Sequence, residues 1–282
     1  MDGIILINKE KQMSSHDVIA ALRKILKMKK IGHCGTLDPM ATGVLVCLLG
    51  KATKLSNYLV LDQKTYQATF QLGLATTTQD LEGEVVVTKP YNFEYQVADI
   101  ERVLEQFKGR LIQTPSIYSA IKVNGKKLYE YARNNEDVVI PTREIEVFDL
   151  DLLKFENDKI TINVKCSSGT YIRTLCYDIA TKLGYPGVLT SLKRIVSGNY
   201  QIENCYTLED IKNNNYQTID LKTALQDYEM IEVNEETVND IRNGKPLKIE
   251  MSQPFIVLYN DEVQALYDKT IDGQAKIIRG LW

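Results

Sequence analysis

The sequence has few residues of the kinds that bind metals or form disulfides. Its 282 residues include five cysteines and two histidines, and no two cysteines form a C-x-x-C pair. An odd number of cysteines without paired spacing argues against a disulfide framework or a zinc site, and it favours a reducing cytoplasm. Two histidines are too few for most histidine-based metal centres. We therefore expect a cytoplasmic protein with no metal, whose chemistry rests on carboxylates.

Targeting segments, membrane spans and nucleotide-binding motifs are also missing. The first residues, MDGIILINKEKQ, combine an acidic second position with a short apolar run, unlike a signal peptide. No apolar run approaches the roughly 20 residues that span a membrane. Gly50-Lys51 is followed by Ala52 instead of a hydroxyl residue, so it is not a phosphate loop, and neither G-x-G-x-x-G nor G-x-S-x-G occurs. We expect no membrane association and no nucleotide cofactor.

The charge is unevenly distributed along the chain. The formal net charge is −3, which excludes a wholly basic surface, and 44% hydrophobic with 25% charged residues is typical of globular proteins. Three segments are nevertheless basic: residues 1–60 and 108–133 each sum to +5, and residues 165–200 sum to +4. Acidic segments lie between them. This pattern is expected if one face binds a polyanion, although charge runs are more often solvated surface.

Local patterns predict a mixed α and β chain. Ser14 and Asp17 have capping-box spacing ahead of a helix, and residues 64–72 alternate like a half-buried strand with Tyr66 on the apolar face. Two further helices are expected to end at Gly109 and Gly184. The expected further strands are residues 3–8, 143–153, 159–166, 255–259, 263–267 and 275–278. The sequence pattern changes near residue 226 to short β-type runs, which predicts a large domain, 1–226, and a small β-rich domain, 227–282.

The densest run of chemically capable residues is GHCGTLDPMATGVL, residues 32–45. Its glycines and proline predict a tight loop, and Pro39 disfavours a helical conformation for Asp38. The loop therefore presents an aspartate and His33 from a constrained backbone. Taken alone, Asp38 could simply cap a turn or a helix.

This run resembles the catalytic loop of the TruB-type tRNA pseudouridine synthases, which act on uridine 55 of the T arm. Further matching blocks follow in the family's order: KTYQA at 64–68, TTTQDLEG at 76–83, YSAIKVNG at 118–125 and SGTYIRT at 168–174. The departures are small, with Cys34 where a small or hydroxyl residue is usual and Met40 where leucine is usual. The resemblance extends from residue 3 to about residue 200.

The resemblance implies an α+β pseudouridine synthase fold, a mixed and largely antiparallel sheet flanked by helices. It implies an RNA-binding thumb at about 115–140 and a small C-terminal PUA-like domain that binds RNA. The implied reaction cleaves the C1′–N1 glycosidic bond of uridine 55 and rejoins the base through C5, with base flipping and without a cofactor. The implied partner is the T-arm stem-loop of tRNA, bound by a monomer with no obligatory protein partner.

The implied catalytic residues are Asp38, Tyr66 and Arg173. Asp38 would act at the anomeric carbon, either by attack at C1′ or by abstracting a proton from the neighbouring sugar carbon. Arg173 would keep this carboxylate ionised and aimed, and Tyr66 would stack on the uracil. His33 would brace the gap left by the flipped base, and Asp80 would contact RNA or position Tyr66. The remaining RNA-binding residues implied are Tyr118, Lys122, Lys126, Lys127 and Tyr171.

Three other functions share some of these features. A non-catalytic tRNA-folding chaperone would use the same basic segments, and chaperone activity could also accompany the enzyme. A guide-RNA-dependent relative would need partner proteins. A carbohydrate-active enzyme using Asp38 and Asp80 would share the anomeric chemistry but leave the basic segments unused.

Overall fold

The structure, a computed structural model, describes residues 1–59, 61–92, 95–119, 121–134 and 136–282. The chain forms two compact units. The first comprises Met1–Pro39, Val44–Val60 and Glu203–Trp282, and the second comprises Met40–Gly43 and Leu61–Ile202. These units do not follow the division near residue 226, which stays a prediction about domains.

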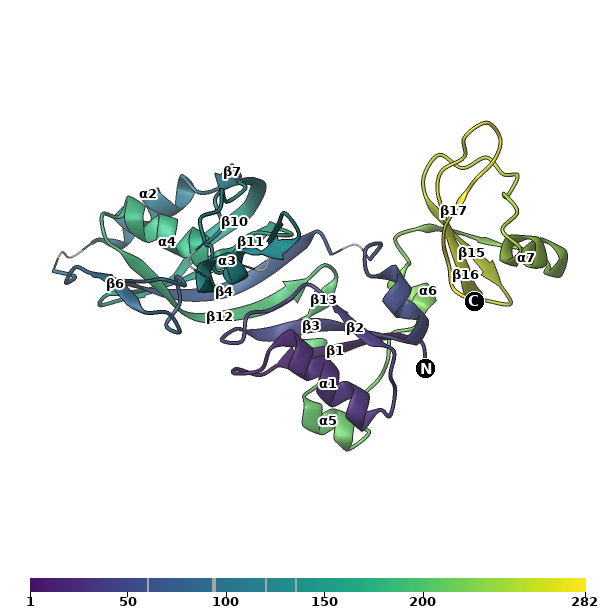
Figure 1. Ribbon diagram of the computed structural model, residues 1–282, viewed down its shortest axis with the longest axis horizontal. Coiled ribbons are helices and arrows are strands. Elements are labelled where there is room, and N and C mark those ends of the chain that lie inside the picture. The colour runs from purple at the N-terminus through teal and green to yellow at the C-terminus, as the bar shows by residue number, and fades with distance from the viewer. Residues whose placement is uncertain (60, 93–94, 120, 135) are drawn as a thin grey trace. The chain divides into compact units, whose positions relative to one another are not determined.

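The first unit combines N-terminal and C-terminal segments of the chain (Figure 1). Its elements, in chain order, are β1 (Gly3–Lys9), α1 (Ser15–Ile25), β2 (Ile31–Cys34), β3 (Thr42–Leu49, whose first two residues belong to the second unit), the 3-10 helices η1 (Gly50–Leu55) and η2 (Ile202–Asn204, whose first residue belongs to the second unit), α5 (Leu208–Lys212), α6 (Leu221–Ala224), β14 (Glu229–Glu232), α7 (Glu235–Arg242), β15 (Phe255–Tyr259), β16 (Glu262–Tyr267) and β17 (Ile277–Gly280).

Helix α1 begins where the sequence predicts. The Ser14 side chain accepts from the backbone N–H of Asp17, and the Asp17 carboxylate accepts from that of Ser14, which completes a capping box. Val18, Ile19 and Leu22 are buried at helical spacing against the apolar residues of β1, β2 and β3. Local sequence therefore determines both the start of this helix and the face that it buries.

The C-terminal part of the first unit contains a separate four-stranded sheet in the order β14-β15-β16-β17. Strands β15 and β16 are joined through Asn260 and Asp261, which both have positive φ, as the tight hairpin turn requires. The rings of Phe255 and Tyr267 stack at a centroid distance of 5.5 Å in its core. A β-rich C-terminal segment is thus confirmed, although β17 begins at Ile277, two residues later than the sequence predicts.

The second unit is built on a long antiparallel sheet (Figure 1). Its elements, in chain order, are β4 (Gln63–Leu72), β5 (Leu74–Thr76), β6 (Val85–Thr88), α2 (Val97–Glu105), β7 (Gly109–Gln113), β8 (Lys122–Val123), β9 (Lys126–Lys127), α3 (Leu128–Arg133), β10 (Arg143–Glu156), β11 (Lys159–Ser167), α4 (Ile172–Lys182), β12 (Gly187–Ser197) and β13 (Tyr200–Gln201).

The strands run in the order β12-β4-β11-β10-β7, with every adjacent pair antiparallel. The start of β3 adds a short parallel pairing, Thr42 with Lys193 and Gly43 with Arg194. Helix α2 packs against β10, and α4 packs against β12 and β4. The α+β class with a largely antiparallel sheet flanked by helices is therefore confirmed.

Strand β4 shows the predicted alternation. Tyr66, Ala68, Phe70 and Leu72 are buried, because β4 is central in the sheet and this face packs into the core. Helix α2, in contrast, ends at Glu105 and not near Gly109. Gly109 has a φ of +89° and begins β7, so this glycine starts a strand instead of terminating a helix.

Asp178 on α4 makes stability depend on pH. Burial raises the pKa of this half-buried carboxyl from 3.8 to about 6, because the charged form loses contact with water. The native state therefore holds the proton more tightly than the unfolded chain, and stability is lost as the pH rises through about 6. We expect Asp178→Asn to raise the free energy of unfolding by about 1 kcal/mol at pH 8, after allowance for solvent screening.

Urea denaturation at pH 8 and pH 5 measures this effect. The gain in the free energy of unfolding should be smaller at pH 5, where Asp178 of the native wild type is already largely protonated. The exposed Asp151→Asn on β10 is the matched control. A gain of equal size at both pH values would contradict the assignment.

Candidate active site

The second unit contains a buried ion pair between two of the predicted site residues. Arg173, the second residue of α4, is 8% exposed, and Asp80 is 4% exposed. The Nη1 atom of Arg173 donates to Oδ2 of Asp80 at 3.3 Å and to the carbonyl oxygen of Thr78 at 2.8 Å. The guanidinium is therefore held by both a charge and a backbone acceptor, and it is largely shielded from water.

Asp80 is itself held by hydrogen bonds within the turn formed by residues 76–82. Its Oδ1 atom accepts from the Thr78 hydroxyl at 2.5 Å and from the Glu82 backbone N–H at 3.1 Å. Its carbonyl oxygen accepts from the Thr76 hydroxyl at 2.5 Å. These contacts favour a role for Asp80 in positioning Arg173. Its expected contact with RNA, or with Tyr66, stays a prediction.

A second contact joins the same turn to the same helix. Thr174, next to Arg173, donates from Oγ1 to Oε1 of Gln79 at 3.0 Å. Gln79 has a φ of +64°, which is strained for a residue other than glycine, and its carbonyl oxygen accepts from the Leu189 N–H at 3.0 Å. Adjacent residues of α4 thus hold adjacent residues of the turn.

Tyr66 lies on the central strand β4 and is 7% exposed. Its directly opposite neighbours are Val164 on β11 and Arg194 on β12, so the three side chains share one face of the sheet. Arg194 is fully buried. Sequence reasoning missed Arg194, because a basic residue in an alternating strand looks like a solvated position.

Gly43 lies against the backbone of the same residue. It has a φ of +104°, and a Cβ atom there would lie 2.1 Å from the carbonyl oxygen of Arg194. Only glycine can therefore occupy this position, since backbone atoms cannot give way. The third glycine of the 32–45 run thus permits the close pairing of β3 with β12.

In the first unit, the residues on each side of Asp38 are anchored. The Leu37 N–H donates to the Ser15 hydroxyl at 2.9 Å, and that hydroxyl donates to the Leu37 carbonyl oxygen at 3.2 Å. The Pro39 carbonyl oxygen accepts from the Gln12 N–H at 2.9 Å. Asp38 is half-buried between these two fixed neighbours. The loop is therefore held at the start of α1 and at the turn that precedes it.

Lys9 also holds this loop, and sequence reasoning missed it. The side chain is fully buried, and its Nζ atom donates to the carbonyl oxygens of Met13 at 2.6 Å, Glu10 at 2.9 Å and Pro39 at 3.3 Å. An ammonium has three donors, which match three backbone acceptors. The only signal in the sequence is a lysine at the end of an apolar strand, which is common at protein surfaces.

Replacing Lys9 by methionine is expected to lower the free energy of unfolding by about 2–4 kcal/mol, because buried carbonyl oxygens lose a charged donor. Urea denaturation measures the loss. Lys11→Met, at an exposed position two residues along, is the matched control and should change stability by about 0.5 kcal/mol or less. Equal effects of the two substitutions would contradict the anchoring role of Lys9.

His33 is half-buried on β2, where it lies opposite Cys47 of β3. It precedes the Asp38 loop on a regular strand, so its backbone position is defined by the sheet. Its bracing role stays a prediction.

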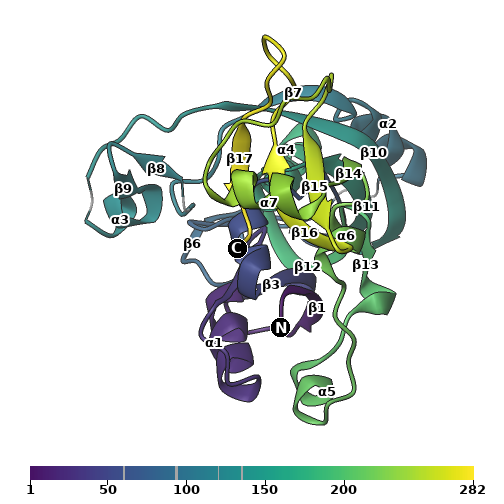
Figure 2. The same ribbon diagram turned by 90° about the vertical axis from the view of Figure 1, so that its right-hand side faces the viewer.

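The predicted thumb is a small structure inserted between β7 and β10. Figure 2 shows β8, β9 and α3 gathered at the end of the long connection that leaves β7. Lys122 is exposed on β8. The Lys126 ammonium pairs with the Glu136 carboxylate at 2.5 Å, which lowers the pKa of Glu136. The Lys126 charge is therefore partly balanced within the thumb.

Aromatic rings alternate with the thumb's basic side chains. Lys127 donates to the Tyr129 hydroxyl at 3.0 Å, which raises the pKa of Lys127, and Arg133 lies over the Tyr129 ring at 5.4 Å. Lys126 lies over the Tyr131 ring at 4.6 Å. Rings and cations are therefore interleaved on the thumb.

The other predicted RNA-binding residues lie at the base of the thumb and at the start of α4. Tyr118 is half-buried, and its N–H donates to the Ser116 hydroxyl at 3.2 Å. Tyr171 is the N-cap of α4. Ala120, within the matched block 118–125, lies outside the described residues.

The structure thus brings Arg173 and Asp80 together and places Tyr66 in the same unit. Asp38 and His33 belong to the first unit. The meeting of Asp38 with Arg173 and Tyr66 at one substrate stays a prediction.

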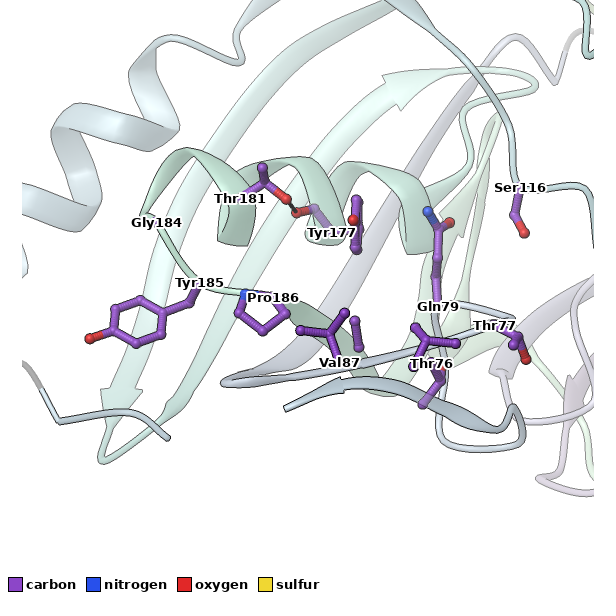
Figure 3. Close-up of a pocket in the computed structure, with 12 residues that line it drawn as sticks. Thr76, Thr77, Gln79, Val87, Ser116, Tyr177, Thr181, Gly184, Tyr185 and Pro186 are labelled. Carbon is purple, nitrogen blue, oxygen red and sulfur yellow. Dashed lines mark hydrogen bonds between the residues drawn. The ribbon is translucent and has the colours of Figure 1, made fainter. Parts of the chain in front are cut away.

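A separate cavity of about 580 Å³ lies in the second unit between α4 and the β5–β6 hairpin (Figure 3). Gln79 lines one end, Tyr185 and Pro186 line the other, and Tyr177 projects from α4. None of its lining residues in the described part of the chain is charged, and Asp38, Tyr66 and Arg173 are not among them. The cavity therefore shares the Gln79 turn with the Arg173 cluster but does not coincide with the predicted catalytic residues.

Within the described residues, no group of three or more histidine, cysteine, aspartate or glutamate side chains is placed to hold a metal ion. Nor does any described helix combine the length and apolarity needed to span a membrane.

Comparison with known proteins places the chain in a family. Residues 23–172 match the family model "TruB family pseudouridylate synthase (N terminal domain)", and residues 173–231 match "tRNA pseudouridylate synthase B C-terminal domain". The chain belongs to the TruB family. The two matches together contain the Asp38 loop, Tyr66, Asp80, the thumb and Arg173, as the sequence resemblance implies.

Curated relatives in the TruB family match nearly the whole chain. A protein named tRNA pseudouridine synthase B from Pediococcus pentosaceus is 43% identical, covering 97% of this chain and 96% of the relative. One of the same name from Bacillus cereus is 41% identical, covering 95% of this chain and 92% of the relative.

Solved structures support the fold. The structure titled "Crystal Structure of a Cbf5-Nop10-Gar1 Complex" aligns with a TM-score of 0.73 at 23% identity, covering 99% of this chain and 85% of that chain. Another, titled "Structure of H/ACA RNP bound to a substrate RNA containing 2'-deoxyuridine", aligns with a TM-score of 0.72 at 22% identity, with the same coverage. Both likenesses concern the fold.

Proposed function

We propose that this TruB-family chain isomerises uridine 55 in the T arm of tRNA to pseudouridine. The observation that carries the proposal is the match, over nearly the full length of both chains, to relatives named tRNA pseudouridine synthase B. The family-model matches, residues 23–231, contain the three residues that the chemistry below requires, Asp38, Tyr66 and Arg173.

The reaction exchanges one bond to the ribose for another. The C1′–N1 bond breaks, the uracil turns within the site, and C1′ bonds to C5. The hydrogen on C5 leaves as a proton and N1 gains one, so the product is an isomer of the substrate. No electrons are transferred to or from an external agent, and an aspartate beside C1′ can stabilise the positive charge that develops there.

The side chains divide this work. Asp38 acts at the sugar, from a loop whose flanking residues are fixed by Ser15, Gln12 and Lys9. Arg173, itself held by Asp80, supplies a permanent positive charge that keeps the Asp38 carboxylate ionised beside the uracil. Tyr66, rigid on a central strand, stacks on the uracil.

The target uridine reaches the site by flipping out of the RNA stack, and the enzyme then braces the gap that the base leaves. Unstacking one nucleotide costs a few kcal/mol, and His33 fills the gap that the base leaves. Exposed Lys122, with Lys126 and Lys127, contacts phosphates from the thumb, while Tyr118 and Tyr171 contact the exposed loop. The β-rich C-terminal segment, 227–282, adds RNA contacts as a PUA-like domain. The chain acts in the cytoplasm as a monomer, without a guide RNA or partner proteins.

Tritium release tests the proposal. The purified chain alone is incubated with a T-arm stem-loop carrying C5-tritiated uridine, because pseudouridine is complete only when the C5 hydrogen has left the new C1′–C5 adduct as a proton. We expect release from the wild type and none from a stem-loop with cytidine at position 55. No release from the wild type would overturn the proposal. Release that requires added protein fractions would favour a partner-dependent enzyme.

A further inference from the structure

The thumb leaves and re-enters the sheet through one pair of residues. Strand β7 ends at Gln113, strand β10 begins at Arg143, and the two lie directly opposite each other in the antiparallel β7–β10 pair. Residues 114–142 therefore form an excursion that is closed at its base by this pair. Both side chains of the pair reach the same loop, which precedes α4.

Gln113 binds the backbone of one loop residue with both ends of its amide. Its Nε2 group donates to the Tyr171 carbonyl oxygen at 3.0 Å, and its Oε1 atom accepts from the Tyr171 N–H at 2.8 Å. The residue is only 3% exposed, so little water competes for these bonds. The side chain reproduces the two hydrogen bonds of a strand pair and fixes Tyr171, the N-cap of α4.

Arg143 holds the loop two residues earlier. Its Nη1 atom donates to the Gly169 carbonyl oxygen at 3.1 Å. Gly169 has a φ of +86°, and a Cβ atom there would lie 2.6 Å from the same Nη1 atom. The Arg143 guanidinium can therefore approach the Gly169 backbone closely, because glycine has no side chain there.

We propose that Gln113 and Arg143 are positioning residues that hold Arg173 in register with the thumb. Arg173 follows Tyr171 by two residues on the first turn of α4, so the position of its backbone depends on the clamped N-cap. The Gln113–Arg143 pair therefore fixes the position of Arg173 relative to the thumb, which binds the RNA phosphates. This inference rests on the proposed function, because it assigns the clamp to the predicted catalytic arginine.

The central test separates rate from binding. Gln113→Met keeps the side-chain length and removes both hydrogen bonds. We expect the single-turnover rate at saturating stem-loop to fall about 10- to 100-fold, since small misplacements of a catalytic group cost this much. The Kd for the stem-loop, measured in an Asp38→Asn background, should change less than about threefold. Arg143→Ala should also lower this single-turnover rate.

Two comparisons distinguish this role from general destabilisation. Arg110→Ala removes an exposed arginine of the same strand pair that contacts Glu144 and not the loop, and it should leave the rate unchanged. In an Arg173→Lys background, Gln113→Met should cost much less than in the wild type, because both changes act through one group. An undiminished effect there, or a loss confined to Kd, would overturn the inference.

Hydrogen–deuterium exchange gives a readout that does not depend on activity. The Tyr171 amide is bound by Gln113, so Gln113→Met should accelerate its exchange, whereas Arg110→Ala should not. Unchanged exchange would overturn the clamp itself. If the wild type releases no tritium while the exchange result holds, then the proposed function fails and the clamp stands without its catalytic role.

Discussion

Replacing Asp38 by asparagine is expected to lower the rate of pseudouridine formation by about 10,000-fold or more, since loss of a nucleophile or of the charge beside it has effects of this size in other enzymes. Asparagine has the same shape but lacks the negative charge that the sugar needs as C1′–N1 breaks. Single-turnover tritium release measures the rate, and filter binding measures the affinity for the stem-loop.

Binding should stay within about threefold of the wild type, because the thumb and the basic segments remain. Glu203→Gln, at an exposed carboxylate of the same unit but outside the segment 227–282, is the control and should retain full activity. An active Asp38→Asn enzyme would remove the aspartate from the mechanism. An inactive variant that also fails to bind RNA would point to a folding or binding role for Asp38.

Substitution of Arg173 is expected to have two separable effects. Arg173→Lys keeps the charge but cannot reproduce the geometry of the contacts to Asp80 and Thr78, and we expect a rate loss of about 100- to 1,000-fold. Arg173→Met leaves the buried Asp80 carboxylate without its cation. The free energy of unfolding should then fall by about 3–5 kcal/mol.

The double variant Arg173→Met/Asp80→Asn tells these effects apart. It removes both charges, so urea denaturation should show that much of the lost stability returns, while tritium release stays at the level of Arg173→Met. Recovery of activity along with stability would mean that Arg173 serves only to neutralise Asp80.

Local sequence predicts those parts of the fold that local physics determines. The capping box of α1 and the alternation of β4 involve residues within a few positions of each other, and both appear as expected. The sequence does not predict the end of α2 correctly, because a glycine at a positive φ can start a strand, as Gly109 starts β7, just as readily as it ends a helix.

The parts of the site that the sequence does not predict depend on contacts between distant residues. Lys9 bonds to a carbonyl 30 residues away, and Gln113 to a backbone 58 residues away. Neither has a distinctive neighbourhood in the sequence, since lysine and glutamine are common at surfaces. Local physics indicates only that Asp38 lies in a tight loop and gives no signal for Arg173, so the catalytic roles of both residues follow from the resemblance of their surrounding motifs to a family.

The pairing at the start of β3 has a consequence for synthesis of the chain. Thr42 donates to the carbonyl oxygen of Leu192 at 3.5 Å across 150 residues, and Gly43 can be packed only once Arg194 is present. A ribosome adds roughly 5–20 residues per second, so the nascent segment waits about 8–30 s for its partner strand. Chains whose translation stops before β12 therefore carry an unpaired, glycine-containing strand start, and these chains should be the ones that chaperones and proteases recognise.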